Sequence, residues 1–156
     1  MGKKVKKKGA LMKTVIVYAS VHHGNTKKLV DAVSEKYGAD TVNALETKEF
    51  DLSPYELVGF ASGIYAGRPH KALAEFAEKN LPENKKVFFL ATSAMNKDLS
   101  GAMATLTEGK NAQILGTYAC RGFNTFGPFK LVGGTSKGHP DEEDVRKALE
   151  FFERLG

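Results

Sequence analysis

The sequence predicts an α/β domain in which helices cover both faces of a parallel sheet. Short apolar segments alternate with amphipathic helical segments, which is the order that parallel strands and their crossover helices produce. The apolar segments are continuous, as expected of strands that are buried on both faces. At 156 residues, the chain is long enough for one domain with a core of its own.

The first strand and helix are predicted from the stretch between Lys13 and Tyr37. Residues Lys13–Ala19 form a β-branched apolar run that favours a buried strand. The helix that follows ends at Gly38, a residue typical of the position just after a helix. Its apolar face consists of Leu29, Val30, Val33 and Tyr37.

The loop between them, Ser20–Thr26, is rich in hydroxyl, amide and small side chains and opens directly into the helix. Backbone N–H groups and the positive end of the helix dipole favour an anion there, so the loop is interpreted as a phosphate site. Gly24 is its only glycine, so neither a Walker A nor a Gly-x-Gly-x-x-Gly sequence is present. The alternative is an ordinary connection with Asn25 or Thr26 as the helix cap.

The later elements follow the same alternation of strand and helix. Further strands are predicted at Ala39–Asn43, Tyr55–Ala61, Lys86–Thr92 and Ala112–Ala119. Helices are predicted after His70 to about Lys79, from Leu99 to Gly109 and from about Asp141 to Leu155. The residues Cys120–Pro140 lack periodicity and are predicted to form a long structured loop.

Two further loops follow strands and are built for contact. They are Ser62–His70 and Thr92–Asp98. Because the carboxyl ends of parallel strands meet at one edge, both are expected beside Ser20–Thr26, where ligands bind in such sheets. This convergence favours the phosphate interpretation.

The net charge of +5 comes from the first residues of the sequence. Five lysines lie within residues 1–11, and removing them from the 23 basic residues leaves 18, which equals the number of acidic residues. We expect residues 1–11 to be a basic extension, disordered or added before a native start at Met12, and residues 12–156 to be the domain. Specific nucleic-acid binding is therefore not expected.

The single cysteine, Cys120, excludes an internal disulfide and is expected to be a small core residue. The sequence has no apolar run long enough for a membrane span, and we expect a cytoplasmic protein. No cluster of histidine, cysteine and acidic residues has metal-ligand spacing, and no nucleophile–base pair for hydrolysis is found. No metal and no hydrolytic residue are therefore predicted.

Four motifs together resemble the flavodoxin family. Tyr18–Thr26 resembles the family's phosphate loop, Ser62–Gly67 the loop against the flavin, and Thr92–Met95 the loop on the flavin's other side. The stretch from Gly122 to Asp144 is similar to the end of small flavodoxin-like proteins. The resemblance implies a three-layer flavodoxin-like fold, with a five-stranded doubly wound sheet in the order 2-1-3-4-5, and bound FMN.

The resemblance also implies which residues contact the FMN. The phosphate would be surrounded by Ser20, His22, His23, Gly24, Asn25 and Thr26. The isoalloxazine would be contacted by Gly63, Ile64, Tyr65 and Ala66, with Tyr65 stacked on it. The far side would be lined by Thr92, Ser93, Ala94 and Met95.

Two functions stay open on these residues. One is an FMN-binding electron carrier between redox partner proteins, with no catalytic residue of its own. The other is a small FMN-dependent oxidoreductase of the protoporphyrinogen dehydrogenase or quinone reductase type. The second is suggested by one extra residue between Ser20 and Gly24, which is similar to flavodoxin-type protoporphyrinogen dehydrogenases, by the neutral domain, and by the aromatic residues in Phe123–Phe129.

Overall fold

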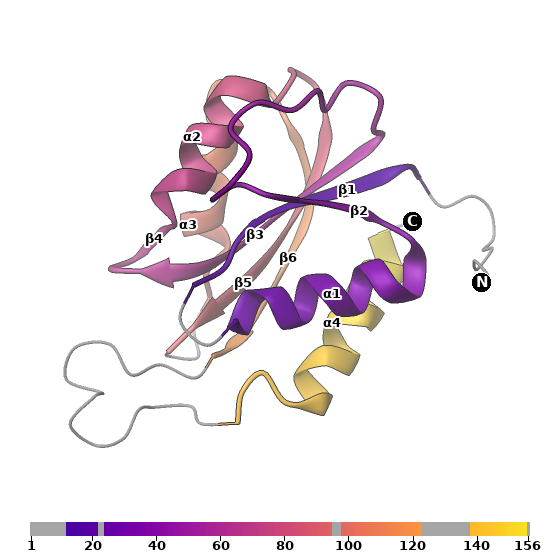
Figure 1. Ribbon diagram of the computed structural model, residues 1–156, viewed down its shortest axis with the longest axis vertical. Helices are drawn as coiled ribbons and strands as arrows, with labels where there is room; N and C mark the ends of the chain where they lie inside the picture. The colour runs from indigo at the N-terminus through magenta and orange to yellow at the C-terminus, as the bar shows by residue number, and fades with distance from the viewer. Residues whose placement is uncertain (1–11, 22–23, 95–97, 123–137, 156) are drawn as a thin grey trace.

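The centre of the molecule is a parallel sheet (Figure 1). The structure, a computed structural model, describes residues 12–21, 24–94, 98–122 and 138–155. Within these residues the parallel strands are β1 (Thr14–Ala19), β2 (Asp40–Asn43), β3 (Leu57–Tyr65), β5 (Lys86–Ser93) and β6 (Gln113–Arg121). Their spatial order is β2-β1-β3-β5-β6, which is the predicted order 2-1-3-4-5 when the parallel strands alone are counted.

Helices cover both faces of this sheet (Figure 1). On one face lie α1 (Asn25–Tyr37) and α4 (Glu142–Leu155), which also contact each other. On the other face lie α2 (Lys71–Asn80), α3 (Ser100–Ala104) and the 3₁₀ turn η1 (Thr105–Thr107). The three-layer α/β architecture is therefore as predicted.

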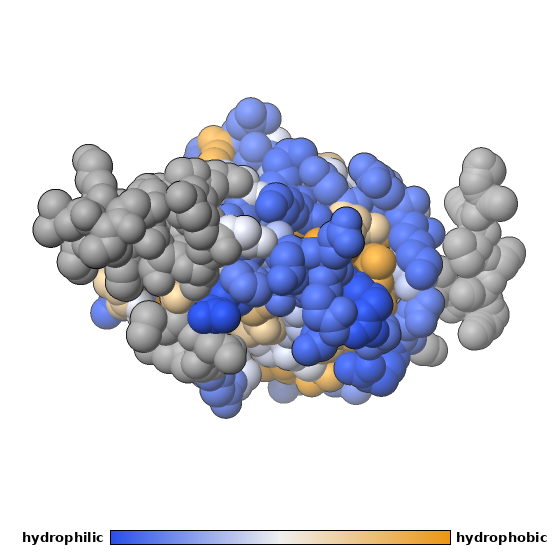
Figure 2. Space-filling view, turned by 90° about the horizontal axis from the view of Figure 1, so that it is seen from below, coloured by the Kyte–Doolittle hydropathy of each residue, from blue (hydrophilic) through white to orange (hydrophobic). Residues whose placement is uncertain are grey.

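Each strand sends alternate side chains into two separate cores. In β1, Val15 and Val17 pack with α2 and α3, whereas Ile16 packs with α1 and α4. All three are fully buried, which explains why the strand sequence is apolar at every position. The outward side of α1 and α4 is mostly polar, as Figure 2 shows.

Gly59 in β3 allows an aromatic ring to lie against the sheet. It pairs with Phe88 of β5, and a Cβ added to Gly59 would lie 2.3 Å from the Phe88 ring. The Phe88 ring also contacts α4, because its centroid is 5.5 Å from that of Phe152. A side chain at position 59 would therefore displace the contact between the sheet and α4.

The predicted loop Ser62–His70 is the clearest error of the sequence prediction. Strand β3 runs on to Tyr65, and β4 (Arg68–Pro69) turns back to pair with it in an antiparallel hairpin. The two turn residues, Ala66 and Gly67, have φ values of 52° and 81°. Positive φ at both central positions is what a two-residue hairpin turn requires, and the sequence signal for it is weak because Ala stands where Asn or Gly is usual.

Other boundaries also differ from the prediction. The third strand begins at Leu57 rather than Tyr55, and the fourth extends one residue, to Ser93. The helix predicted to end at Gly109 is a short α3 followed by η1. The fifth strand continues through Cys120 and Arg121, where the sequence predicts the start of the long loop. None of the helices that the structure describes is long and apolar enough to cross a membrane.

Candidate functional site

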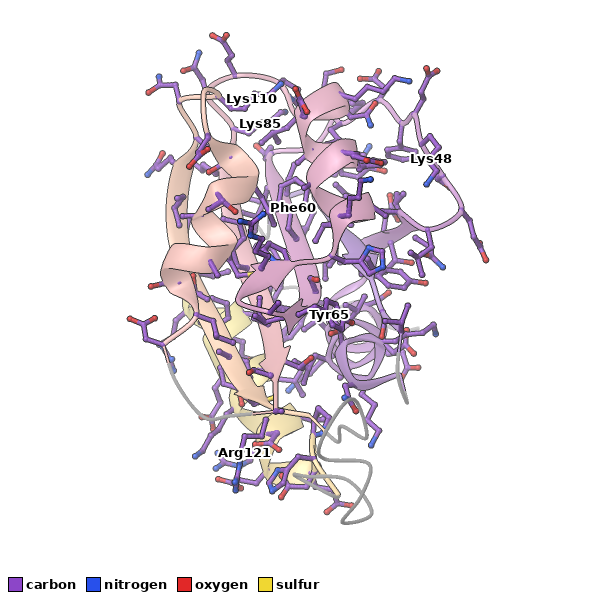
Figure 3. All side chains as sticks on the ribbon, turned by 90° about the vertical axis from the view of Figure 1, so that its left-hand side faces the viewer. Lys48, Phe60, Tyr65, Lys85, Lys110 and Arg121 are labelled. Atoms are coloured by element: carbon purple, nitrogen blue, oxygen red, sulfur yellow. The ribbon has the colours of Figure 1, made fainter. Side chains whose placement is uncertain are left out.

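The strands place the predicted site residues at one edge of the sheet. Figure 3 shows Tyr65 and Arg121, the last residues of β3 and β6, toward one end of the molecule, and Lys85 and Lys110 at the opposite end. Because β1, β3 and β5 are parallel neighbours, the segments that follow them also meet at the first of these ends.

The start of α1 lies at this edge and has an unusual distribution of charge. Its N-cap, Gly24, is left-handed with φ 65°, and no side-chain hydrogen bond caps the helix from that position. The first turn contains Lys27 and Lys28 and no acidic residue. Lysines at a helix start oppose the helix dipole, so this end of α1 is electrostatically suited to an anion. The alternative in which Asn25 or Thr26 is the N-cap is wrong.

Ser20 holds the loop against the helix. Its Oγ accepts a hydrogen bond from the backbone N–H of Lys27, at 3.1 Å. The Lys27 ammonium lies 2.9 Å from Asp31, and that of Lys28 donates to the carbonyl oxygen of Pro140 at 3.3 Å. The first turn is thus tied to the loop before it and to the segment before α4.

A buried hydroxyl pair joins α1 to β5. The Oγ1 atoms of Thr26 and Thr92 are 3.0 Å apart, and both residues are buried. A hydrogen bond between two hydroxyls shielded from water fixes their separation, since neither has solvent as a substitute partner. The first and third predicted loops are therefore linked directly beneath the site.

Tyr65 connects the loop after β1 with the β3–β4 hairpin. Its hydroxyl lies 2.7 Å from where a Cβ on Gly63 would stand, so a side chain at position 63 would have to displace the Tyr65 ring. Burial raises the pKa of the Tyr65 phenol, and a backbone hydrogen bond from Val21 opposes that rise. The ring of His70 stands edge-on to that of Tyr65, with centroids 5.8 Å apart. Tyr65 therefore bridges the loop after β1 and the hairpin after β3.

The base of the hairpin is fixed by buried polar contacts. The Ser62 hydroxyl donates to the carbonyl oxygen of Gly63 at 2.6 Å and accepts from the N–H of His70 at 2.9 Å. His70 in turn caps α2, because its Nδ1 accepts from the N–H of Ala72 at 2.9 Å. These bonds set where Ile64, half-buried, and Ala66, exposed, are presented.

The end of β6 approaches the start of α1 from the other side. A Cβ added to Gly122 would lie 2.6 Å from the side-chain nitrogen of Asn25, and the Gly122 N–H donates to the carbonyl oxygen of Ser93 at 2.9 Å. Ser93 and Ala94 are half-buried beside this contact. Sequence reasoning missed this role of Gly122, because nothing in the sequence pairs it with Asn25.

Some predicted residues lie outside the described part of the chain. These are His22, His23, Met95, the extension 1–11 and the aromatic stretch Phe123–Phe129. The other predicted contacts are brought to one edge of the sheet. They are Ser20, Gly24, Asn25, Thr26, Gly63, Ile64, Tyr65, Ala66, Thr92, Ser93 and Ala94.

Cys120 is a core residue, as predicted. It is 7% exposed, and burial raises the pKa of its thiol to about 12, with the nearby Asp144 carboxylate adding to the rise. The neighbouring Arg121 therefore does not activate it.

A group of possible metal ligands that the spacing analysis did not anticipate lies before α4. Ligand atoms of His139, Asp141 and Asp144 fall within 4.8 Å of one another. Each has a protein partner: the His139 Nδ1 is 2.6 Å from Asp144, and the two aspartates each accept the other's backbone N–H at 2.9 Å. These hydrogen bonds explain why the three residues lie close together, because they stabilise the first turn of α4.

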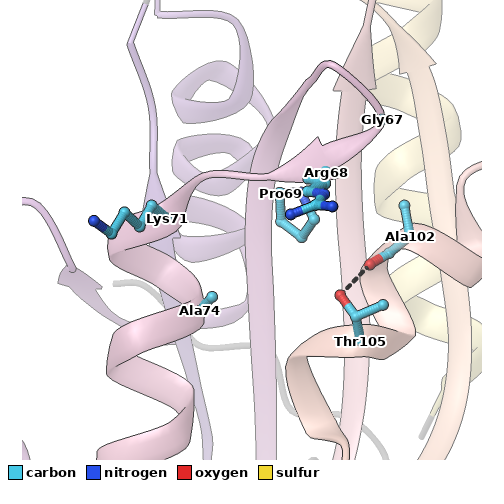
Figure 4. A pocket seen from close by; sticks show the side chains of 7 residues that line it. All are labelled: Gly67, Arg68, Pro69, Lys71, Ala74, Ala102 and Thr105. Carbon is cyan, nitrogen blue, oxygen red and sulfur yellow. Dashed lines mark hydrogen bonds between the residues drawn. The ribbon is translucent and has the colours of Figure 1, made fainter.

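A cavity opens on the α2 and α3 face, directly after the hairpin. It measures about 620 Å³ and lies between β4, α2 and α3 (Figure 4). Arg68 and Pro69 of β4 form one wall, and Ala102 and Thr105 form the other. No sequence pattern predicts this cavity, because its lining residues become neighbours only through the hairpin.

Comparison with known proteins identifies the family. The family model described as a flavodoxin domain matches residues 15–118. The chain belongs to the flavodoxin family. An uncharacterized protein from Methanocaldococcus jannaschii is 38% identical over 151 residues, which cover 92% of this flavodoxin-family chain and 98% of that protein.

Solved structures share the fold of this flavodoxin-family protein. A flavodoxin, WrbA-like protein from Agrobacterium tumefaciens has a TM-score of 0.65 at 16% identity, covering 93% of this chain and 95% of that one. A flavodoxin from the domain Archaea has a TM-score of 0.62 at 13% identity, covering 91% and 98%. A flavoprotein from Lactobacillus acidophilus, solved in complex with FMN, has a TM-score of 0.55 at 18% identity, covering 71% and 93%.

Proposed function

We propose that this protein binds FMN at the edge formed by the start of α1, the β3–β4 hairpin and the end of β5, and carries electrons between redox partner proteins. The observation that supports this most is the start of α1, where the N-cap is the left-handed Gly24, which has no side chain, and the first turn holds no acidic residue. A phosphate there would be stabilised by the helix dipole and by the first-turn cations.

The described residues fit an FMN in chemical type. Ser20, Gly24, Asn25 and Thr26 would hold the phosphate, and Gly63, Ile64, Tyr65 and Ala66 would lie against the ring system. Thr92, Ser93 and Ala94 would complete the far side, and His22, His23 and Met95 would join these sets. When bound, FMN supplies one- or two-electron transfer, and the protein supplies binding, orientation and shielding from water.

The buried hydroxyl pair and Tyr65 give this site a fixed shape. The Thr26–Thr92 bond sets the distance between the phosphate end and the far side. Tyr65, bonded to the backbone at Val21, sets the position of the hairpin relative to the loop after β1. A flavin held by groups that are already positioned loses less affinity to ordering them.

The first experiment is the visible absorption spectrum of the purified protein, before and after addition of FMN. We expect flavin bands that co-purify, or quenching of FMN fluorescence that saturates at one equivalent. Riboflavin, which lacks the phosphate, should bind at least about 100-fold more weakly, because the helix start then has no anion to stabilise. A protein that neither carries flavin nor quenches added FMN would refute the proposal.

A charge substitution tests the place of the phosphate. In Ser20→Asp, the carboxylate can still accept the Lys27 N–H but adds a negative charge beside α1. We expect FMN affinity to fall about tenfold or more while riboflavin affinity changes little. The matched control is Gln113→Glu, an exposed position at the start of β6 and the opposite edge of the sheet, which should alter neither affinity.

The second candidate is a small FMN-dependent oxidoreductase of the protoporphyrinogen dehydrogenase or quinone reductase type. It is favoured by the cavity of about 620 Å³ that begins at Gly67, next to the residues proposed to meet the flavin, because its volume is typical of small-molecule sites. Stepwise reductive titration separates the two functions. A carrier should take up electrons in two distinct one-electron steps, and an oxidoreductase of this type in a single two-electron step.

A further inference from the structure

We propose that the cavity between β4, α2 and α3 is a binding site for a small organic acid with an apolar body and one carboxylate. The binding itself does not depend on the flavin, whereas a role for the acid as the protein's substrate rests on the proposed function. Among the residues that line the cavity are Arg68, Pro69, Lys71, Ala74, Ala102 and Thr105.

The apolar character of the site comes from its walls. Pro69, Ala74 and Ala102 are small, so the space between α2 and α3 stays open at the level of β4 (Figure 4). The Thr105 hydroxyl donates to the carbonyl oxygen of Ala102 at 2.7 Å, so its proton is already committed. The walls thus offer contact area and few hydrogen-bond donors, which suits a hydrocarbon body.

Two cationic residues, Arg68 and Lys71, line the cavity. In Figure 4 the Arg68 side chain lies beside Pro69, between α2 and the segment with Ala102 and Thr105, whereas the ammonium of Lys71 points away from them. Lys71 lies 3.7 Å from Glu75 on the same helix, in a pair where both side chains are mostly exposed. Among the described residues, no ion pair includes Arg68. Its planar group is suited to bind a carboxylate through two parallel hydrogen bonds.

Size and charge together select the occupant. A volume of about 620 Å³ lies in the range of small-molecule sites and is too large for an inorganic ion alone. Of the two lining cations, Lys71 is paired with Glu75, so the Arg68 guanidinium balances one negative charge and a polyanion would leave charges unpaired. The lysine-rich residues 1–11 have the same sign as Arg68 and are therefore excluded as an occupant.

The test compares three probes by backbone amide chemical shifts in the full-length protein, with and without FMN. They are 2-naphthoate, its neutral analogue 2-naphthamide, and acetate. We expect 2-naphthoate to shift the amides of Gly67, Arg68, Ala74 and Thr105 and to saturate. Naphthamide should bind about tenfold more weakly and acetate not measurably.

Two variants locate the contacts. Arg68→Gln should weaken 2-naphthoate about tenfold and leave naphthamide unchanged, whereas the control Arg154→Gln, on the exposed end of α4, should change neither. Ala74→Leu fills the cavity from α2 with a good helix former and should abolish binding of both probes. Unchanged shifts outside the cavity show that each variant is folded.

Three results would overturn the proposal. They are equal affinities for naphthoate and naphthamide, an Arg68→Gln variant with wild-type affinity, and concentration-dependent dimerisation that shifts these amides without any probe. A protein that fails to bind FMN but binds 2-naphthoate at these residues would refute the proposed function and support this site. Loss of both would refute both.

Discussion

At the scale of single residues, Gly59 shows how a missing side chain determines packing. The Phe88 ring occupies the space above it and reaches Phe152 on α4, so three elements meet through one glycine. The backbone conformation at Gly59 is that of an ordinary strand, which means that contact rather than φ excludes a side chain there.

Gly59→Ala should therefore destabilise the protein by about 2–3 kcal/mol, because Phe88 has no free volume to move into. The measurement is the urea midpoint followed by circular dichroism. The control is Gly101→Ala in α3, where an added Cβ meets nothing within 4 Å and the free energy of unfolding should stay equal or rise by up to about 1 kcal/mol. Equal effects of the two substitutions would contradict this explanation.

The sequence indicates some of the site residues and cannot indicate others, for a physical reason. Ser20, Thr26 and Thr92 could be predicted, because hydroxyl residues next to buried strands are a local pattern. The closeness of Gly122 to Asn25, and of Tyr65 to Gly63, depends on how distant or turning segments pack. Arg68 could not be singled out, because its position depends on the unpredicted hairpin.

At the scale of elements, the Thr26–Thr92 bond is the link between α1 and the sheet at the site edge. Both hydroxyls are buried, so each depends on the other for a partner. Removing one hydroxyl leaves the other buried without a hydrogen-bond partner, because water does not reach it. Removing both hydroxyls leaves no buried polar group that needs a partner.

Thr92→Val should cost about 1–3 kcal/mol, because the Thr26 hydroxyl is left buried and unpaired. The double variant Thr26→Val/Thr92→Val should be less destabilised than the sum of the two single variants. A double-mutant cycle from urea unfolding measures the coupling. Strictly additive effects would show that the two hydroxyls do not depend on each other.

The element order could be predicted from the sequence, but several ends could not. The continuous apolar runs at β1 and β5 place those strands correctly, since burial on both faces leaves a strong signal. The hairpin was missed because Ser62 and Gly63 look like loop residues, although Ser62 is fully buried and its hydroxyl is bonded to the backbone. A buried polar residue that forms its hydrogen bonds within a strand cannot be recognised from the hydrophobic pattern of the sequence.

At the scale of the whole molecule, the folded state holds several protons more firmly than the unfolded chain. Burial raises the pKa of the Cys120 thiol from 9.0 to about 12. Burial also raises the pKa of the Tyr37 and Tyr118 phenols above 10.0. A hydrogen bond to Asp40, 2.6 Å long, raises the pKa of Tyr55 to about 12. All four groups prefer the protonated form when the protein is folded.

Stability should consequently fall at alkaline pH. Below pH 9 the contribution of Cys120 is complete, and it is lost as the pH rises from 9 toward 12, because the unfolded chain releases its proton first. We expect Cys120 alone to contribute a slope of roughly 1 kcal/mol per pH unit between pH 9 and 11, measured by urea unfolding, and the three tyrosines to make the slope steeper. Cys120→Ala should reduce the slope near pH 9–10. A stability that rises over this range would refute the assignment.

The β3–β4 hairpin separates two places where a ligand is proposed. Its β3 strand and turn contain Gly63, Ile64, Tyr65 and Ala66, which are assigned to the flavin, whereas Gly67, Arg68 and Pro69 line the cavity. If each ligand favours one position of the hairpin, thermodynamic reciprocity applies, and the factor by which FMN changes the affinity for the organic acid must equal the factor by which the acid changes the affinity for FMN. A change in backbone conformation at the two turn residues with positive φ, Ala66 and Gly67, would then couple the binding of FMN to the binding of the organic acid.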